Sequence, residues 1–255
     1  MELLPPKVVR ASGACENINT LFEVSSGKNF SWFGSEDRKH QAYLAQTAQL
    51  YLEAFVPYLE KVYSVGSSFR AEPGNDSRHL TEFTLIEIEF AGGFEKLLSY
   101  IERFIHRVSR DILQLPAKDR ILLGLDEKAL KRLELVQLPF PRLSYDRAIQ
   151  CLNLEWGDDI SRIKEQELVE RLGNQPTFIT HYPDPLWDNG KEIEVEKFFN
   201  MLPDPMRPGR VLSADLILPI AGEAVGSAAR VHNPETLLYR LENSKMFKLL
   251  THSIK

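Results

Sequence analysis

The chain has 255 residues, of which 43% are hydrophobic and 26% are charged, and its formal net charge at pH 7 is −5. This composition is typical of a globular protein with a sizeable core; the acidic charge does not indicate a nucleic-acid or anionic-membrane surface, and two cysteines, Cys15 and Cys151, are too few for a disulfide scaffold or a zinc site. No apolar run approaches the roughly 20 residues of a membrane span and no signal peptide is evident, so we expect a cytoplasmic protein with no membrane partner.

The N-terminal part is predicted to be extended and then helical. Prolines near the start stop any helix there, residues 20–24 (TLFEV) are typical of a strand, and residues 30–32 suggest another short one. Residues 41–58 place apolar side chains at helical spacing, which predicts a helix that ends near Pro57.

A hairpin with unexplained charges follows. Two strand-like runs, residues 62–69 and 83–90, flank a turn rich in Pro, Gly, Asn, Asp and Ser, the composition of a hairpin loop. A hairpin does not need charges to fold, and a positive cluster with acids beside it would suit a nucleoside triphosphate. A solvated tip with no binding role is the alternative from composition alone. The charged residues are Arg70, Glu72, Arg78, His79 and Glu82.

The rest of the chain alternates helical and strand-like segments. A long amphipathic helix is predicted over residues 95–115, and residues 116–173 look helical, with a solvated charged face and no constellation that suggests chemistry. Local loops between strands and helices in blocks favour an α+β fold with a largely antiparallel sheet. The remaining predicted strands are 176–183, 197–202 and 211–220, and the last predicted helix is 234–250.

Two further polar clusters lie near apolar strands. Asp215 is followed eight residues later by Glu223, and two such carboxylates could hold magnesium beside phosphate oxygens; alternatively Asp215 caps a turn and Glu223 is merely exposed. Arg230 follows a run of small residues, where an arginine fork could grip a carboxylate, or it is a surface residue that opens a helix. No P-loop, dinucleotide-binding glycine motif or GxSxG elbow appears.

Four segments, taken together, resemble the aspartyl/asparaginyl group of class II aminoacyl-tRNA synthetases, and the asparaginyl enzymes and asparagine-synthetase-like paralogues most. SSFRAEPGNDSRHLTEFTLIEIE resembles motif 2, and SGACENINTLFEV looks like the substrate-covering loop with its following strand. AYLAQTAQLYLEA and DLILPIAGEAVGSAARVH are similar to further segments of the asparaginyl enzymes, in the same order. The resemblance spans nearly the whole chain and matches least in the helical middle.

The resemblance implies the class II catalytic fold and ATP-dependent adenylation of asparagine or aspartate with Mg²⁺. Arg70 would clamp the α-phosphate and the amino-acid carboxylate, Glu72 would bind the adenine amino group, and Phe83 would stack on adenine. Leu52 stands where aspartyl enzymes carry a lysine that binds the substrate side chain, which favours asparagine. The other implied contacts are Arg78 and His79 to the outer phosphates, Glu223 to magnesium, Asp215 beside it or at the substrate, Glu16 and Gln49 to the substrate ammonium, and Arg230 to its side-chain end.

The sequence also departs from the family pattern. It contains no counterpart of motif 3 and only the tail of motif 1, and Ala229 replaces a glutamine of the family. We therefore expect a partial catalytic domain over residues 1–255, with a mainly helical insertion at about 116–173 and no anticodon-binding domain. The family suggests a homodimer, while the acidic charge gives only weak support for tRNA as a partner. A non-catalytic paralogue that binds a nucleotide, an amino acid or a partner, and an ammonia-dependent asparagine synthetase, are the alternatives.

Overall fold

The computed structural model describes residues 1–9, 20–24, 42–71, 80–187, 190, 193, 198–244 and 247. The chain divides into two compact units, Met1–Ala91 and Gly92–Lys255, and each contains a hydrophobic core of its own. Among the helices in these residues, none combines the length and apolar character needed to cross a membrane.

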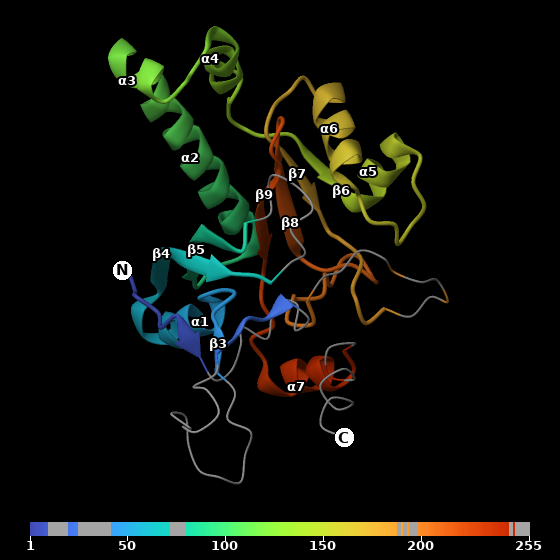
Figure 1. Ribbon diagram of the computed structural model, residues 1–255. Coiled ribbons are helices and arrows are strands. Elements are labelled where there is room, and N and C mark those ends of the chain that lie inside the picture. The colour runs from blue at the N-terminus through green and yellow to red at the C-terminus, as the bar shows by residue number, and fades with distance from the viewer. Residues whose placement is uncertain are drawn as a thin grey trace. The chain divides into compact units, whose positions relative to one another are not determined.

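The first unit is built on the predicted hairpin (Figure 1). Strands β4 (Lys61–Phe69) and β5 (Glu82–Phe90) pair antiparallel along their full length, which confirms both predicted strands. Helix α1 (Gln49–Leu59) packs on the hairpin, and its Leu52 forms a small core with Val62 of β4. In the first half of β4 exposed and buried side chains alternate, as expected for a strand whose successive side chains point to opposite faces and that is covered on one of them.

A second, three-stranded sheet of this unit corrects the predicted helix over residues 41–58. Its strands β1 (Val8–Val9), β2 (Glu23–Val24) and β3 (Ala42–Leu44) have the order β1–β3–β2. Residues 42–44 have helical spacing but form β3, because segments distant in sequence pair with both of its edges. The helix begins only at Gln49 and runs through Pro57 in its last turn. Of the strand predicted over 20–24, only the last two residues form a strand, which is β2. The strand predicted over 30–32 lies outside the described residues.

The second unit contains a four-stranded sheet in the order β6 (Arg142–Ser144), β7 (Thr177–Thr180), β8 (Ser213–Leu218) and β9 (Gly222–Ala228). The β7–β8 and β8–β9 pairs are antiparallel, as predicted, whereas β6 pairs parallel with β7.

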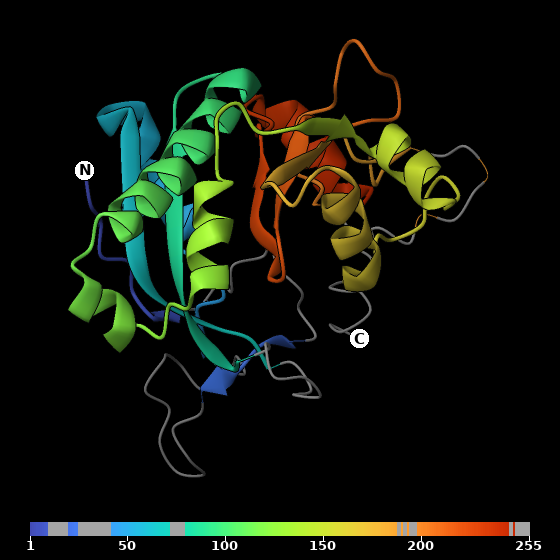
Figure 2. The ribbon, with the colours of Figure 1, turned by 90° about the horizontal axis from the view of Figure 1, so that it is seen from above.

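Helices cover both faces of this sheet (Figures 1 and 2). Helix α2 (Phe94–Leu113), which confirms the predicted amphipathic helix, packs with Phe178 and Leu216 in one core cluster. Helices α5 (Tyr145–Leu152) and α6 (Arg162–Arg171) pack with Ile179 and Ile217 in the other. Adjacent residues of β7 and β8 thus enter opposite clusters, because side chains alternate across a sheet.

The remaining segments differ from prediction in their extent. Helices α3 (Ala117–Leu122) and α4 (Glu127–Glu134) lie in the segment predicted as helical, which also contributes β6. The strand predicted over 197–202 is wrong for its described part, where Met201 forms only an isolated bridge to Arg230. The strand predicted over 211–220 is confirmed as β8, which is shorter than predicted at both ends. Helix α7 (Pro234–Glu242) ends before Asn243, Phe247 is again helical, and residues 245–246 and 248–250 of the predicted helix lie outside the described residues.

Candidate functional site

At the turn end of the hairpin, the structure brings Arg70 and Phe83 together. Arg70 directly follows β4, and its backbone N–H donates to the carbonyl of Thr81 at 3.0 Å, so the β4–β5 pairing continues one residue further. Phe83 lies on β5 opposite Ser68, and the Arg70 guanidinium carbon is 5.3 Å from the centre of the Phe83 ring. A half-buried guanidinium held against an aromatic ring is partly pre-oriented, and a guanidinium is a donor group that suits a phosphate or a carboxylate.

Helix α1 starts in the same unit with Gln49, which is buried. Glu87 of β5 accepts the Ala48 backbone N–H with both carboxylate oxygens, at 3.0 and 2.9 Å, and so fixes the start of the helix on the hairpin. The Gln49 side-chain nitrogen donates to Glu53 at 2.6 Å. The Gln49 amide is therefore oriented through its nitrogen, and its oxygen is the atom suited to accept from an ammonium group.

Some of the residues predicted for the site lie outside the described part of the chain. They are Glu16, which precedes β2 in the sequence, and Glu72, Arg78 and His79, which come between β4 and β5 in the sequence. Their roles stay predictions from the sequence.

In the second unit, the structure brings Asp215 and Glu223 together across the β8–β9 pair. Asp215 lies opposite Gly226 in the register. A Cβ atom on Gly226 would come within 3.1 Å of Glu223 Oε1 and 3.9 Å of Asp215 Oδ1, so the missing side chain leaves room for the Glu223 carboxylate close to Asp215. Asp215 is buried in the middle of β8, and Glu223 is exposed on β9. The alternative in which Asp215 caps a turn is therefore wrong.

A buried tyrosine, which the sequence reasoning did not single out, supports this carboxylate pair. Tyr182 has an exposed fraction of 4%, and its hydroxyl donates a hydrogen bond to Asp215. Burial, then the charge of Asp215 and this hydrogen bond, and then the charges of Glu223 and Glu165 raise the pKa of the Tyr182 hydroxyl well above its ordinary value. The hydroxyl therefore keeps its proton at neutral pH and remains a donor to Asp215. No local pattern in the sequence predicts this contact, because Tyr182 follows a different strand, β7.

Arg230 lies two residues beyond the end of β9. It is half-buried, forms an isolated bridge with Met201, and donates from Nη1 to the side-chain oxygen of Asn200 at 3.3 Å. It does not open a helix, because α7 begins only at Pro234. Among the described residues, no group of three or more His, Cys, Asp or Glu side chains could hold a metal ion. Asp215 and Glu223 are a pair rather than a full coordination shell.

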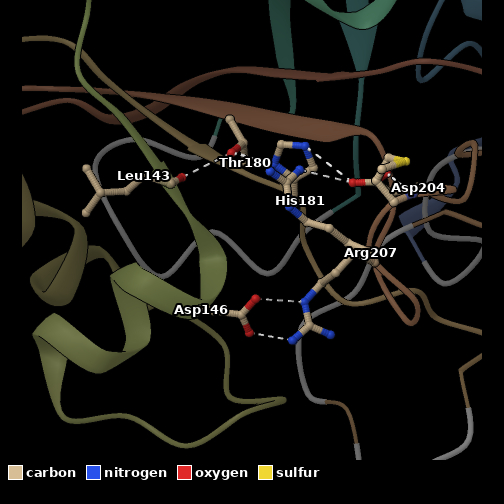
Figure 3. A network of polar contacts seen from close by, with 8 residues as sticks. Leu143, Asp146, Thr180, His181, Asp204 and Arg207 are labelled. Carbon is tan, nitrogen blue, oxygen red and sulfur yellow. Dashed lines mark hydrogen bonds and ion pairs between the residues drawn. The ribbon is translucent and has the colours of Figure 1, made fainter.

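A second polar network surrounds His181, next to Tyr182 (Figure 3). Thr180 Oγ1 donates to the carbonyl of Leu143 at 3.2 Å, so it accepts from His181 Nδ1, 2.8 Å away. The other ring nitrogen faces Asp204 Oδ2 at 3.6 Å. Burial and the positive charge of Arg207 lower the pKa of His181, although Asp204, Glu95 and Asp146 oppose the shift. His181 is consequently neutral at pH 7.

This lowered pKa predicts an acid-labile contribution of His181 to stability. The unfolded chain binds a proton at His181 near its ordinary pKa of about 6.5, whereas the folded chain does so only at lower pH. The contribution is therefore fully present above about pH 6.5 and is lost as the pH falls toward the folded pKa. His181 has φ +58°, which asparagine tolerates well, so His181→Asn is the test variant. Urea unfolding from pH 8 to pH 5 should show a smaller loss of stability for the variant than for the wild type; equal losses would contradict the prediction.

Comparisons with known proteins agree on one family. A sequence model of the family described as tRNA synthetases class II (D, K and N) matches residues 1–252. The asparagine–tRNA ligase of Roseiflexus sp. (strain RS-1) is 38% identical over 213 residues, which cover 78% of this chain and 45% of that protein. That of Pyrococcus furiosus is 38% identical over 247 residues, which cover 94% of this chain and 51% of that protein. The chain thus spans about half the length of the curated relatives it matches.

Solved structures show the same likeness in three dimensions. The asparaginyl-tRNA synthetase from Pyrococcus horikoshii, complexed with asparaginyl-adenylate, superposes with a TM-score of 0.79 at 34% identity, over 97% of this chain and 54% of that one. The asparaginyl-tRNA synthetase of Entamoeba histolytica superposes with a TM-score of 0.69 at 28% identity, over 94% of this chain and 50% of that one. The helices and largely antiparallel sheets described above are therefore those of a class II catalytic domain, as predicted.

Proposed function

The chain belongs to the class II aminoacyl-tRNA synthetases of the D, K and N group, and on this premise we propose that it activates asparagine with ATP. The reaction joins a carboxylate oxygen of asparagine to the α-phosphorus of ATP and breaks the bond from that phosphorus to pyrophosphate. In such a transfer, positioning and charge stabilisation supply most of the catalysis. The observation that carries the proposal is the arginine held against a phenylalanine ring at the turn end of the hairpin.

Arg70 has the central role in this proposal. Its guanidinium bridges the α-phosphate and the attacking carboxylate, because a planar fork can donate to two anionic groups at once. The charge that develops at phosphorus then meets a donor that is already oriented by the Phe83 ring. Phe83 also offers a face to the adenine ring, and Glu72, Arg78 and His79 hold the adenine amino group and the outer phosphates.

Glu223 and Asp215 fit a magnesium ion. The donor set consists of hard carboxylate oxygens, and the absent side chain of Gly226 leaves space between them. Magnesium is commonly bound by one or two carboxylates together with substrate phosphates and water, so a pair without a third acidic ligand suffices. When bound, the ion neutralises charge on the ATP phosphates. Tyr182 orients the Asp215 carboxylate through its hydrogen bond.

Asparagine is preferred to aspartate because of Leu52. This residue occupies the position where aspartyl enzymes carry a lysine, and its side chain is fully buried in the core of the first unit. No cation is therefore supplied from this position for a substrate carboxylate. Gln49 and Glu16 would meet the substrate ammonium, and Arg230 its side-chain end. A tRNA acceptor and a homodimer are further proposals, which rest on the family.

ATP–pyrophosphate exchange on the 255-residue chain tests the proposal. We expect exchange that depends on added asparagine and Mg²⁺ and that is at background with aspartate. Exchange with aspartate instead would overturn the choice of amino acid. No exchange with either amino acid would refute the proposed activation and favour a binding protein without turnover. If asparagine formed from aspartate, ATP and ammonia, the product would identify an asparagine synthetase.

A further inference from the structure

Helix α6 holds the turn between β8 and β9 through side chains on one of its faces. Gln166 contacts the turn twice: its side-chain nitrogen donates to the Leu218 carbonyl at 3.2 Å, and its side-chain oxygen accepts the backbone N–H of Ile220. Arg162 Nη2 donates to the Ile220 carbonyl at 3.1 Å. All of these contacts bridge more than 50 residues of sequence. The turn is therefore fixed by a distant helix as well as by its own strands.

The same helix also reaches the first residues of β9. Glu165 Oε2 accepts the backbone N–H of Glu223 at 3.2 Å. Helix α6 is itself anchored by Leu168 and Val169, which are buried in the core cluster that includes Ile217 of β8. The contacts from α6 to the turn thus start from a rigid base.

The turn needs such support because of its backbone conformation. Ile220 has φ +71°, a left-handed conformation that a β-branched residue rarely adopts. A residue in this region persists only where its surroundings determine its conformation. The side chains of Gln166 and Arg162 bind the backbone N–H and carbonyl of Ile220, and these two contacts determine its conformation. Glu223 follows three residues later, so the turn determines where its side chain begins.

We propose that Gln166 and Glu165 are positioning residues that hold the Glu223 carboxylate beside Asp215 for a divalent cation. This inference rests on the proposed role of Glu223 toward magnesium, and it assigns a purpose to α6, whose charges otherwise look like an ordinary solvated face. Neither residue contacts the cation. Gln166 acts through the Ile220 turn, and Glu165 acts through the backbone of Glu223 itself.

The test uses Mn²⁺ as a paramagnetic probe, titrated into the full chain without nucleotide and followed by electron paramagnetic resonance. Gln166→Ala should weaken Mn²⁺ binding by about tenfold, the usual range for loss of a residue that orients a metal ligand. It should also speed hydrogen exchange of the Ile220 amide by about fivefold, as expected for one lost hydrogen bond. The matched control is Glu170→Ala, which changes an exposed residue one turn further along α6 and should alter neither measurement.

The two positioning residues are separated by a conservative pair of variants. Glu165→Gln keeps an oxygen that can accept the Glu223 N–H and should bind Mn²⁺ within twofold of the wild type, whereas Glu165→Ala should bind about tenfold more weakly. If Glu165→Gln weakened binding as much as Glu165→Ala did, Glu165 would act through its charge, and the inference would be wrong for this residue.

The outcomes distinguish this inference from the function on which it rests. If Gln166→Ala exchanged faster at Ile220 but bound Mn²⁺ as the wild type does, α6 would serve only the fold, and the inference would be overturned. Glu223→Ala is the reference for the metal site. If that variant bound Mn²⁺ normally, the proposed role of Glu223 would itself fail, and the inference would fall with it for that separate reason.

Discussion

Arg70→Ala is expected to weaken binding of a non-hydrolysable asparaginyl-adenylate mimic by at least about 100-fold. The substitution removes a guanidinium that donates to two anionic groups, and hydrogen bonds to charged groups contribute about 1.5–3 kcal/mol each. Two such bonds amount to roughly 3 kcal/mol or more, which corresponds to about two orders of magnitude in Kd. Isothermal titration calorimetry with the mimic measures the loss directly. Arg70→Lys should give an intermediate affinity, because it keeps the charge but loses the fork.

The matched control for Arg70 is Arg103→Ala. Arg103 is an exposed arginine of α2 whose guanidinium carbon lies 5.0 Å from the centre of the Tyr100 ring, so it also contacts an aromatic ring. Its loss should change the affinity by less than twofold. If Arg70→Ala unfolded at the same urea concentration as the wild type and bound the mimic equally well, Arg70 would have no part in the site.

Arg240→Ala is expected to lower the free energy of unfolding by about 3–5 kcal/mol, because it leaves a buried carboxylate unpaired. Arg240 of α7 donates from Nη1 and Nη2 to the Asp184 carboxylate at 3.0 and 2.8 Å, and from Nε to the Phe199 carbonyl at 2.6 Å. The exposed fractions of the two ionic residues are 5% and 7%. Urea unfolding followed by circular dichroism gives the change, provided that the slope of the transition stays constant.

An exposed ion pair provides the comparison for Arg240. Arg107 pairs with Asp111 one turn along α2, and both side chains are largely exposed. Arg107→Ala should therefore cost no more than about 0.5 kcal/mol. A loss of similar size for Arg240→Ala would contradict the prediction. Replacing both members of the buried pair by apolar residues, as in Arg240→Met with Asp184→Leu, should recover part of the stability, because no buried charge then remains unpaired.

The hairpin shows what local sequence predicted well. Its two strands were predicted to within one residue at each end, because a cluster of turn-forming residues separates two apolar segments of strand character. Arg70 and Phe83 were expected in one site from motifs shared with the synthetase family, and Asp215 was expected near Glu223, whereas the contact of Arg70 with the Phe83 ring was not predicted. Both pairs lie on adjacent antiparallel strands, where a short connection brings the partners together.

The errors arose where distant segments decide the conformation. Residues 42–44 have the apolar spacing of a helix but form β3, since β1 and β2 satisfy the backbone hydrogen bonds on both of its edges. Met201 forms only an isolated bridge, although its neighbours in sequence are typical of a strand. In both cases the partner segments, rather than the local propensity, determine the state.

The sequence by itself determined the family, the main elements and the residue types suited to ATP and an amino acid, because these depend on local patterns and motifs. Only the tertiary structure decided which side chains hold the candidate site in place. Tyr182 meets Asp215, and α6 meets the β8–β9 turn, across separations of about 30 and more than 50 residues. Such contacts leave no periodic signal in the sequence, because they form only when the packed sheet and helices bring the segments together.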